Sequence, residues 1–148
     1  EEGIVYAYIH HNERVGVLLE LNCETDFVAM TPDFKEIARS ISLHIVASKP
    51  LYVSRDSLPM LHEVQERELN RRKTLEEGKP EHVVDKIVDG RMEKFYKTVC
   101  LMEQEYVLDE NITVGDFIKS QIARLGENIK VKQFSMFTIG EERGKLFN

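Results

Sequence analysis

The stretch Leu21-Asn22-Cys23-Glu24-Thr25-Asp26-Phe27-Val28 joins two elements that its flanking residues predict. Before it, the odd-numbered residues of 15–21 are all apolar, which is the two-residue period of a strand. After it, Thr31-Pro32-Asp33 predicts a helix start with a hydroxyl cap and a proline in the first turn. The stretch is therefore predicted to be a tight connection that carries an acid, a hydroxyl and an aromatic ring side by side.

The pair Asp26-Phe27 has two interpretations. In the first, the ring of Phe27 folds back as a lid on the core, which is the commoner arrangement for an isolated Asp-Phe pair because phenylalanine is usually buried. In the second, Phe27 is an aromatic anchor presented to a partner, and Asp26 adds charge to the same contact. Local sequence leaves both interpretations open.

An α+β fold is expected around this connection, with a small antiparallel three-stranded sheet packed on helices. Residues 3–10 and 14–22 predict two strands of a hairpin. Apolar residues at three- and four-residue spacing over 33–48 predict an amphipathic helix, in which His44 lies one position off the apolar stripe as a half-buried packing residue. A further helix is predicted to start at Thr113, with Asp116 completing its cap.

The last strand is predicted over residues 128–139 and has apolar residues on both faces. Strict alternation predicts that one face carries Ile129, Val131, Phe137 and Ile139 and that the other carries Phe134 and Met136. A strand with two apolar faces has more apolar surface than one core needs, which favours a contact with a second molecule.

Residues 59–98 predict two helices joined by a short turn. Gly78-Lys79-Pro80 ends the first helix, because glycine suits a left-handed cap and proline cannot continue a helix. Helices joined by so short a turn should lie antiparallel as a protruding hairpin. The first of them is rich in charge, which indicates either a solvated face or an arm used in assembly.

Composition limits the class of protein. The 148 residues fit one domain, and 42% hydrophobic with 31% charged residues is typical of a soluble globular protein. The net charge of −6 argues against a nucleic-acid binder that neutralises phosphates. No apolar run approaches the length that crosses a membrane, so no membrane partner is expected.

The sequence predicts no metal, no cofactor and no catalytic residue. His10 and His11 are neighbours on a strand and point to opposite faces, and Cys23 and Cys100 have no ligand spacing. Cys23 follows an apolar strand, where an inert thiol is the usual state. There is no Gly-rich phosphate loop and no nucleophile elbow, so the chain is not expected to be an enzyme.

Segments throughout the chain also match a known family in the same order: Tyr8-Ile9-His10-His11-Asn12, Arg14-Val15-Gly16-Val17, Glu20 to Ala29, Leu43-His44-Ile45, Gly78-Lys79-Pro80, Glu127-Asn128-Ile129 and Phe137-Thr138-Ile139-Gly140. Together they resemble the signature of bacterial-type elongation factor Ts. The resemblance covers essentially the whole chain, and the run Thr25-Asp26-Phe27-Val28 is among the family's most specific marks.

The resemblance implies a translation elongation factor that binds elongation factor Tu and promotes exchange of GDP for GTP. Thr25, Asp26, Phe27 and Val28 would bind the partner, with Asp26 and Phe27 inserted near its magnesium and phosphate site. Residues 1–148 would form a single core domain with the hairpin 59–98 as an insertion, and the family's N-terminal helical domain would be absent.

The resemblance further implies a homodimer, because single-copy members of the family dimerise, and Phe134 with Met136 would supply the dimer face. It places the chain in the bacterial cytoplasm, or in an organelle stroma or matrix. The alternative is an architectural dimerisation or binding module that has no exchange activity of its own.

Overall fold

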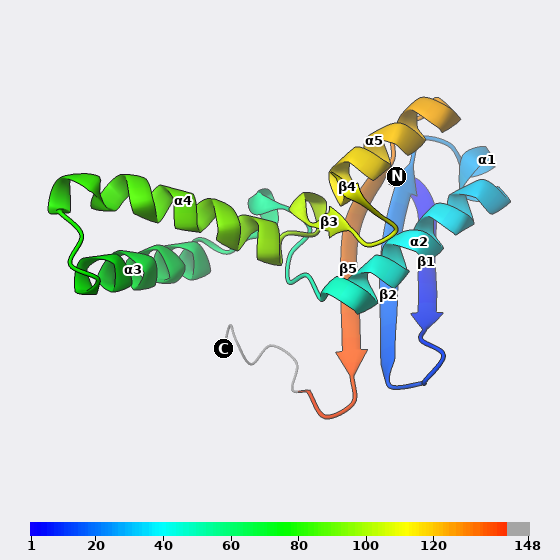
Figure 1. The fold of residues 1–148 in the computed structure, drawn as a ribbon. Helices are drawn as coiled ribbons and strands as arrows, with labels where there is room; N and C mark the ends of the chain where they lie inside the picture. The colour runs from blue at the N-terminus through cyan, green and yellow to red at the C-terminus, as the bar shows by residue number, and fades with distance from the viewer. Residues whose placement is uncertain (142–148) are drawn as a thin grey trace.

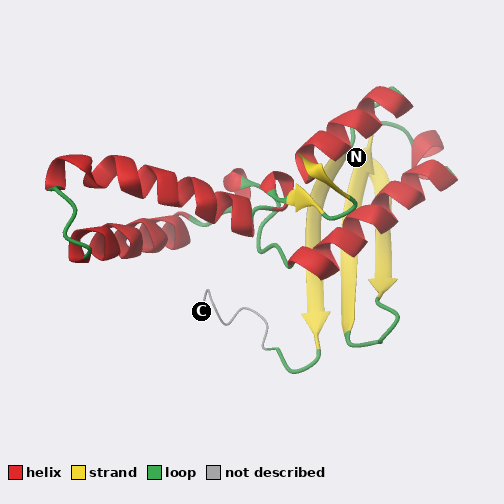
Figure 2. Ribbon diagram, viewed as in Figure 1, coloured by secondary structure: helices red, strands yellow, loops and turns green. Residues whose placement is uncertain are grey.

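The structure, a computed structural model, describes residues 1–141. A three-stranded sheet is covered on one face by helices, and a helical hairpin projects away from it (Figure 1; helices and strands are distinguished by colour in Figure 2). This arrangement confirms the predicted α+β class.

The sheet is antiparallel throughout and has the order β1-β2-β5. Its strands are β1 (Glu2–Ile9), β2 (Val15–Cys23) and β5 (Lys130–Thr138), each within two residues of its predicted limits. The central strand β2 supplies Val17, Leu19 and Leu21 to the core, as the two-residue period predicts.

The helices that cover the sheet are α1 (Asp26–Ala29), α2 (Pro32–Ser48) and α5 (Val114–Leu125). Thr31 caps α2 by accepting the backbone N–H of Phe34 at 3.2 Å, and Thr113 and Asp116 form the predicted capping box of α5. The stripe of α2 is buried against β2 and consists of Phe34, Ile37, Ala38, Ile41 and Ile45. Between α2 and α5 lie the short elements η1 (Arg55–Ser57), η2 (Leu101–Glu103), β3 (Glu105–Tyr106) and β4 (Asp109–Thr113).

The predicted faces of the last strand are wrong because β5 contains a bulge. Leu21 pairs with Val131 whereas Glu20 pairs with Gln133, so one extra residue enters β5 at this point. An inserted residue reverses the face of every side chain that follows it. Phe134 and Met136 therefore lie on the same side as Val131 and pack against the core, instead of opposite to it.

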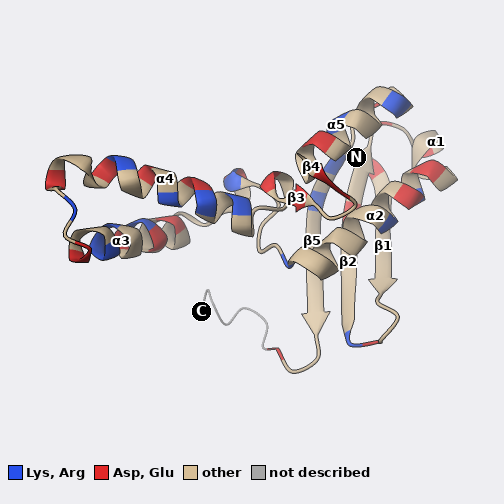
Figure 3. Cartoon of the chain, viewed as in Figure 1, with Lys and Arg blue, Asp and Glu red and all other residues tan. Residues whose placement is uncertain are grey.

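Within residues 1–141, no helix lies on the far side of the sheet (Figure 1), and large apolar side chains are exposed there. We call this surface the outer face and define it by its exposed apolar residues, which are Val5, Ile9, Leu18, Phe137 and Ile139. Figure 3 shows that most of the length of the three strands is uncharged. The outer face is thus an apolar surface of the sheet that is exposed to solvent, whereas the opposite face is buried in the core.

The hairpin consists of α3 (Met60–Glu76) and α4 (Glu81–Val99), which confirms the predicted antiparallel pair. Its apolar seam comes almost entirely from α4, since Thr74 is the only residue of α3 that is buried. Charges of both signs follow its length (Figure 3), and ion pairs join the two helices, as in Arg67–Asp89 at 2.8 Å. We call this hairpin the arm.

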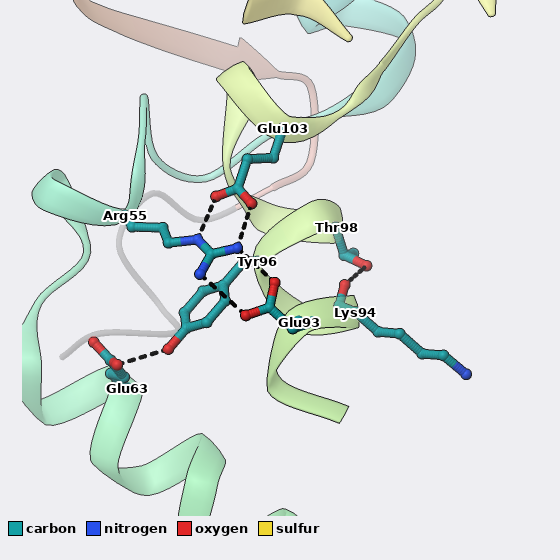
Figure 4. Close-up of polar contacts among 7 residues, drawn as sticks. All are labelled: Arg55, Glu63, Glu93, Lys94, Tyr96, Thr98 and Glu103. Atoms are coloured by element: carbon teal, nitrogen blue, oxygen red, sulfur yellow. Dashed lines mark hydrogen bonds and ion pairs between the residues drawn. The ribbon is translucent and has the colours of Figure 1, made fainter. Parts of the chain in front are cut away.

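The base of the arm is fixed to the core by a cluster around Arg55 (Figure 4). The guanidinium donates two hydrogen bonds to Glu103 of η2, at 2.8 and 2.7 Å, and two to Glu93 of α4, at 3.2 and 2.7 Å. It also lies 4.1 Å from the centre of the Tyr96 ring, and the Tyr96 hydroxyl donates to Glu63 of α3 at 2.6 Å. Paired forks of this kind are directional as well as strong, so the cluster helps to orient the arm relative to the core.

His44 is fully buried, not half-buried as predicted. Its Nδ1 accepts the backbone N–H of Val107 at 3.2 Å, so Nε2 carries the proton and donates to Gln104 Oε1 at 2.9 Å. Gln104 in turn donates to the carbonyl oxygen of Thr98 at 2.7 Å, near the end of α4. The ring is therefore a neutral structural link between α2 and the arm.

We expect the stability of the chain to decrease when the pH is lowered, because of His44. Burial lowers the pKa of His44, so below about pH 6.5, the ordinary value for histidine, the unfolded state binds more protons than the folded state. The free energy of unfolding in urea should therefore be lower at about pH 5.5 than at about pH 7.5. His44→Gln should reduce this difference, whereas His82→Gln, on the exposed surface of α4, should not change it. An equal pH difference in all three proteins would contradict the role of His44.

Candidate partner-binding site

The predicted connection after β2 contains the single helical turn α1. Thr25, in an extended conformation, is its N-cap and accepts the backbone N–H of Val28 at 3.3 Å. Val28 packs against the core and Ala29 is buried, so this side of α1 is anchored. Thr25, Asp26 and Phe27 are exposed on its other side.

The ring of Phe27 is 78% exposed, so the interpretation of Phe27 as a core lid is wrong. The phenylalanine that fills the core at this point is Phe34, which is fully buried. Met30, three residues after Phe27, is 76% exposed, and residues at this spacing are neighbours on a helical turn. Phe27 and Met30 thus form an exposed apolar pair beside the carboxylate of Asp26.

A carboxylate from another part of the chain holds this turn. Glu127, just after the end of α5, accepts the backbone N–H groups of Glu24 and Thr25, both at 3.1 Å, and the hydroxyl of Thr25 at 2.6 Å. In return, Glu24 Oε2 accepts the backbone N–H of Asn128 at 2.9 Å. Glu127-Asn128-Ile129 was one of the segments that matched the family, but sequence reasoning assigned no role to Glu127 itself. Next to it, Gly126 ends α5 in a left-handed conformation (φ 74°) and turns the chain back toward the sheet.

The chemistry of a nucleophile is not assembled near this turn. Cys23 is buried, burial raises the pKa of its thiol, and the thiol donates to the carbonyl oxygen of Thr25 at 3.2 Å. His10 lies at the opposite end of the sheet, where its backbone N–H bonds to Val15. Within residues 1–141, no group of three or more histidine, cysteine or acidic side chains is arranged to hold a metal ion. Nor does any helix in the same range have the length and apolarity needed to cross a membrane.

Residues 1–141 match the family model described as Elongation factor TS. The chain belongs to the elongation factor Ts family. Among curated relatives, elongation factor Ts of Fervidobacterium nodosum is 48% identical over 141 residues, which is 95% of this chain and 72% of the relative. That of Carboxydothermus hydrogenoformans is 51% identical over 144 residues, covering 97% of this chain and 66% of the relative. That of Thermosipho melanesiensis is 47% identical over 140 residues, or 95% of this chain and 71% of the relative.

These comparisons confirm the family predicted from the sequence. The chain spans between 66% and 72% of the length of these three elongation factor Ts relatives. The run Thr25-Asp26-Phe27-Val28, which is among the family's most specific marks, forms the start of α1 in this elongation factor Ts core, with its first three residues exposed and Val28 packed against the core.

Proposed function

We propose that this chain binds elongation factor Tu and promotes the exchange of GDP for GTP by inserting Asp26 and Phe27 near the partner's magnesium and phosphate site. The observation that carries the proposal is the exposure of the Phe27 ring, 78%, on a turn whose opposite side is anchored in the core. A large ring held in solvent by a fixed backbone is the arrangement of an anchor residue.

Such a mechanism needs no catalytic group. An exchange factor works by binding the nucleotide-free partner more tightly than the loaded one, and the nucleotide must then weaken the factor's binding by the same ratio. The ring of Phe27 would separate packed elements of the partner, and Met30 would extend the apolar contact. The carboxylate of Asp26 would compete with the groups that organise the magnesium ion.

The experiment that tests this function follows the release of a fluorescent GDP analogue from elongation factor Tu. We expect the release rate to rise with the concentration of this chain and then to saturate, as a binding-driven step requires. A rate that stays at its spontaneous value at every concentration would instead favour the alternative, a binding module without exchange activity. We also propose that this chain acts in a reducing cytoplasm. Cys23 and Cys100 are both free and buried, which fits such a compartment.

We also propose that the chain forms a homodimer, through the outer face and not through Phe134 and Met136. The latter two side chains pack against the core, whereas the outer face leaves five large apolar side chains exposed, namely Val5, Ile9, Leu18, Phe137 and Ile139. A contiguous apolar surface of this kind is unusual on a monomer.

Leu18→Lys should shift the chain to the monomer mass in sedimentation equilibrium at micromolar concentration. Leu18 lies on the central strand of the sheet, so a lysine there would place a charge in the middle of the proposed contact. Met60→Lys, at an apolar position on the arm that is even more exposed (79% against 50% for Leu18), is the control and should leave the mass unchanged. A wild-type chain that is monomeric, or a Leu18→Lys variant that stays dimeric, would contradict the proposed face.

A further inference from the structure

The carboxylate of Glu127 contacts the Asp26-Phe27 turn without belonging to it. The three groups that donate to it, two backbone N–H groups and one hydroxyl, all come from Glu24 and Thr25, immediately before Asp26. An ionised carboxylate can only accept hydrogen bonds, so it suits a site with three converging donors. More than 100 residues separate the partners in sequence, and the contact therefore fixes the turn relative to the α5–β5 connection.

The hydroxyl of Thr25 transmits this contact into α1. It has a single proton, which it gives to Glu127 Oε2 at 2.6 Å, and this leaves its lone pairs to accept the N–H of Val28 at 3.3 Å. Glu127 thus sets the orientation of the N-cap that holds the helical turn. The hydrogen bonds of Glu127 also lower the pKa of its carboxyl group, chiefly through the Thr25 hydroxyl, so the acceptor is fully ionised at neutral pH.

The exposed residues of the turn need such a contact. The side chains of Phe27 and Met30 are mostly in solvent, so packing within the chain does not fix their positions. On one side, α1 is held by Val28 and Ala29 in the core, and at its start it is held by Thr25 and Glu127. A turn that already has its bound conformation loses less conformational freedom when a partner binds.

We infer that Glu127 is a positioning residue for the Asp26-Phe27 site: it does not touch the partner but holds the turn in the conformation that the partner recognises. The inference rests on the proposed function for the identity of the partner. The effect of Glu127 on the conformation of the turn can be measured on this chain without any partner.

Glu127→Gln is the sharpest variant, because it keeps the shape of the side chain but turns an NH2 group toward one of the three donors. Asp116→Asn is the matched control: it removes the same charge from a carboxylate that caps a helix through Thr113, at the other end of α5. In the free chain, Glu127→Gln should speed hydrogen exchange at the amides of Glu24, Thr25 and Val28, whereas the control should not. Unchanged exchange at these amides would overturn the inference whatever the partner does.

With elongation factor Tu carrying fluorescent GDP, Glu127→Gln should raise the concentration of the chain needed for half-maximal release by about three- to tenfold. The maximal rate should change little, because the turn still reaches the same bound conformation. A variant that matches wild type in this assay, while Phe27→Ala is slow, would overturn the inference and leave the proposed function standing. If Phe27→Ala also matches wild type, the proposed role of the turn is itself wrong.

A double variant separates positioning from direct contact. If Glu127 acts through Phe27, adding Glu127→Gln to Phe27→Ala should have little further effect on release. Were Glu127 to bind the partner itself, the substitution would raise the half-maximal concentration by the same factor in both backgrounds. Equal factors would therefore refute a positioning role.

Discussion

Phe27→Ala should slow GDP release from elongation factor Tu by about tenfold or more, the effect of losing an anchor residue. The same substitution should change the free energy of unfolding by less than about 0.5 kcal/mol, because surface side chains contribute little to the fold. The physical reason is that the ring is 78% exposed, so in the proposed complex its packing partners would belong to elongation factor Tu and not to this chain. Release of fluorescent GDP and urea unfolding of the same preparation measure the two effects.

Asp26→Ala provides the internal comparison for Phe27→Ala. It should also slow release, and the double variant should be slower by less than the product of the two effects, because adjacent residues act on one site. If a folded Phe27→Ala chain promotes GDP release from elongation factor Tu at the wild-type rate, the turn has no part in the proposed mechanism.

Phe34→Ala should have the opposite pattern and destabilise the chain by about 3–5 kcal/mol, the range for deleting a buried aromatic side chain. Phe34 has no exposed surface and lies between α2 and the sheet, so its removal leaves a cavity in the main core. The measurement is urea unfolding, with Phe27→Ala as the matched control seven positions earlier. A loss below about 1 kcal/mol would show that the core closes around the cavity.

The sequence predicted the elements that depend on local spacing. The strands, the stripe of α2, the capping box at Thr113 and the two helices of the arm all follow from residues within a few positions of each other. Phe34 belongs to such a stripe, with Ile37, Ala38 and Ile41 on the same side, and its burial could be predicted. Phe27 belongs to a four-residue turn without a stripe, so local spacing could not decide between lid and anchor.

Features that depend on pairing across the chain could not be predicted. The bulge in β5 arises from its register against β2, and one extra residue was enough to reverse the faces of Phe134 and Phe137. The contact of Glu127 with Thr25 joins residues that are 102 positions apart in sequence. Glutamate is common at protein surfaces, so its presence in a family segment did not indicate which residue it would contact. His44 is buried because Gln104 and Val107 satisfy its ring, and both partners come from a distant segment.

The Arg55 cluster has a consequence for any partner large enough to contact both the arm and the α1 turn. Arg55 joins η1, η2 and α4, and backbone hydrogen bonds of Tyr52 with Val99 and Leu101 lie at the same place, so the base of the arm is held before a partner binds. Once a partner is bound at the turn, the arm is presented to it at a high effective concentration. Because the arm moves little relative to the turn, this effective concentration is not reduced by flexibility. Two weak contacts can then act as one strong one, but only for a partner whose dimensions match the spacing. In this way the contacts at the base of the arm, Arg55 among them, would select partners by size.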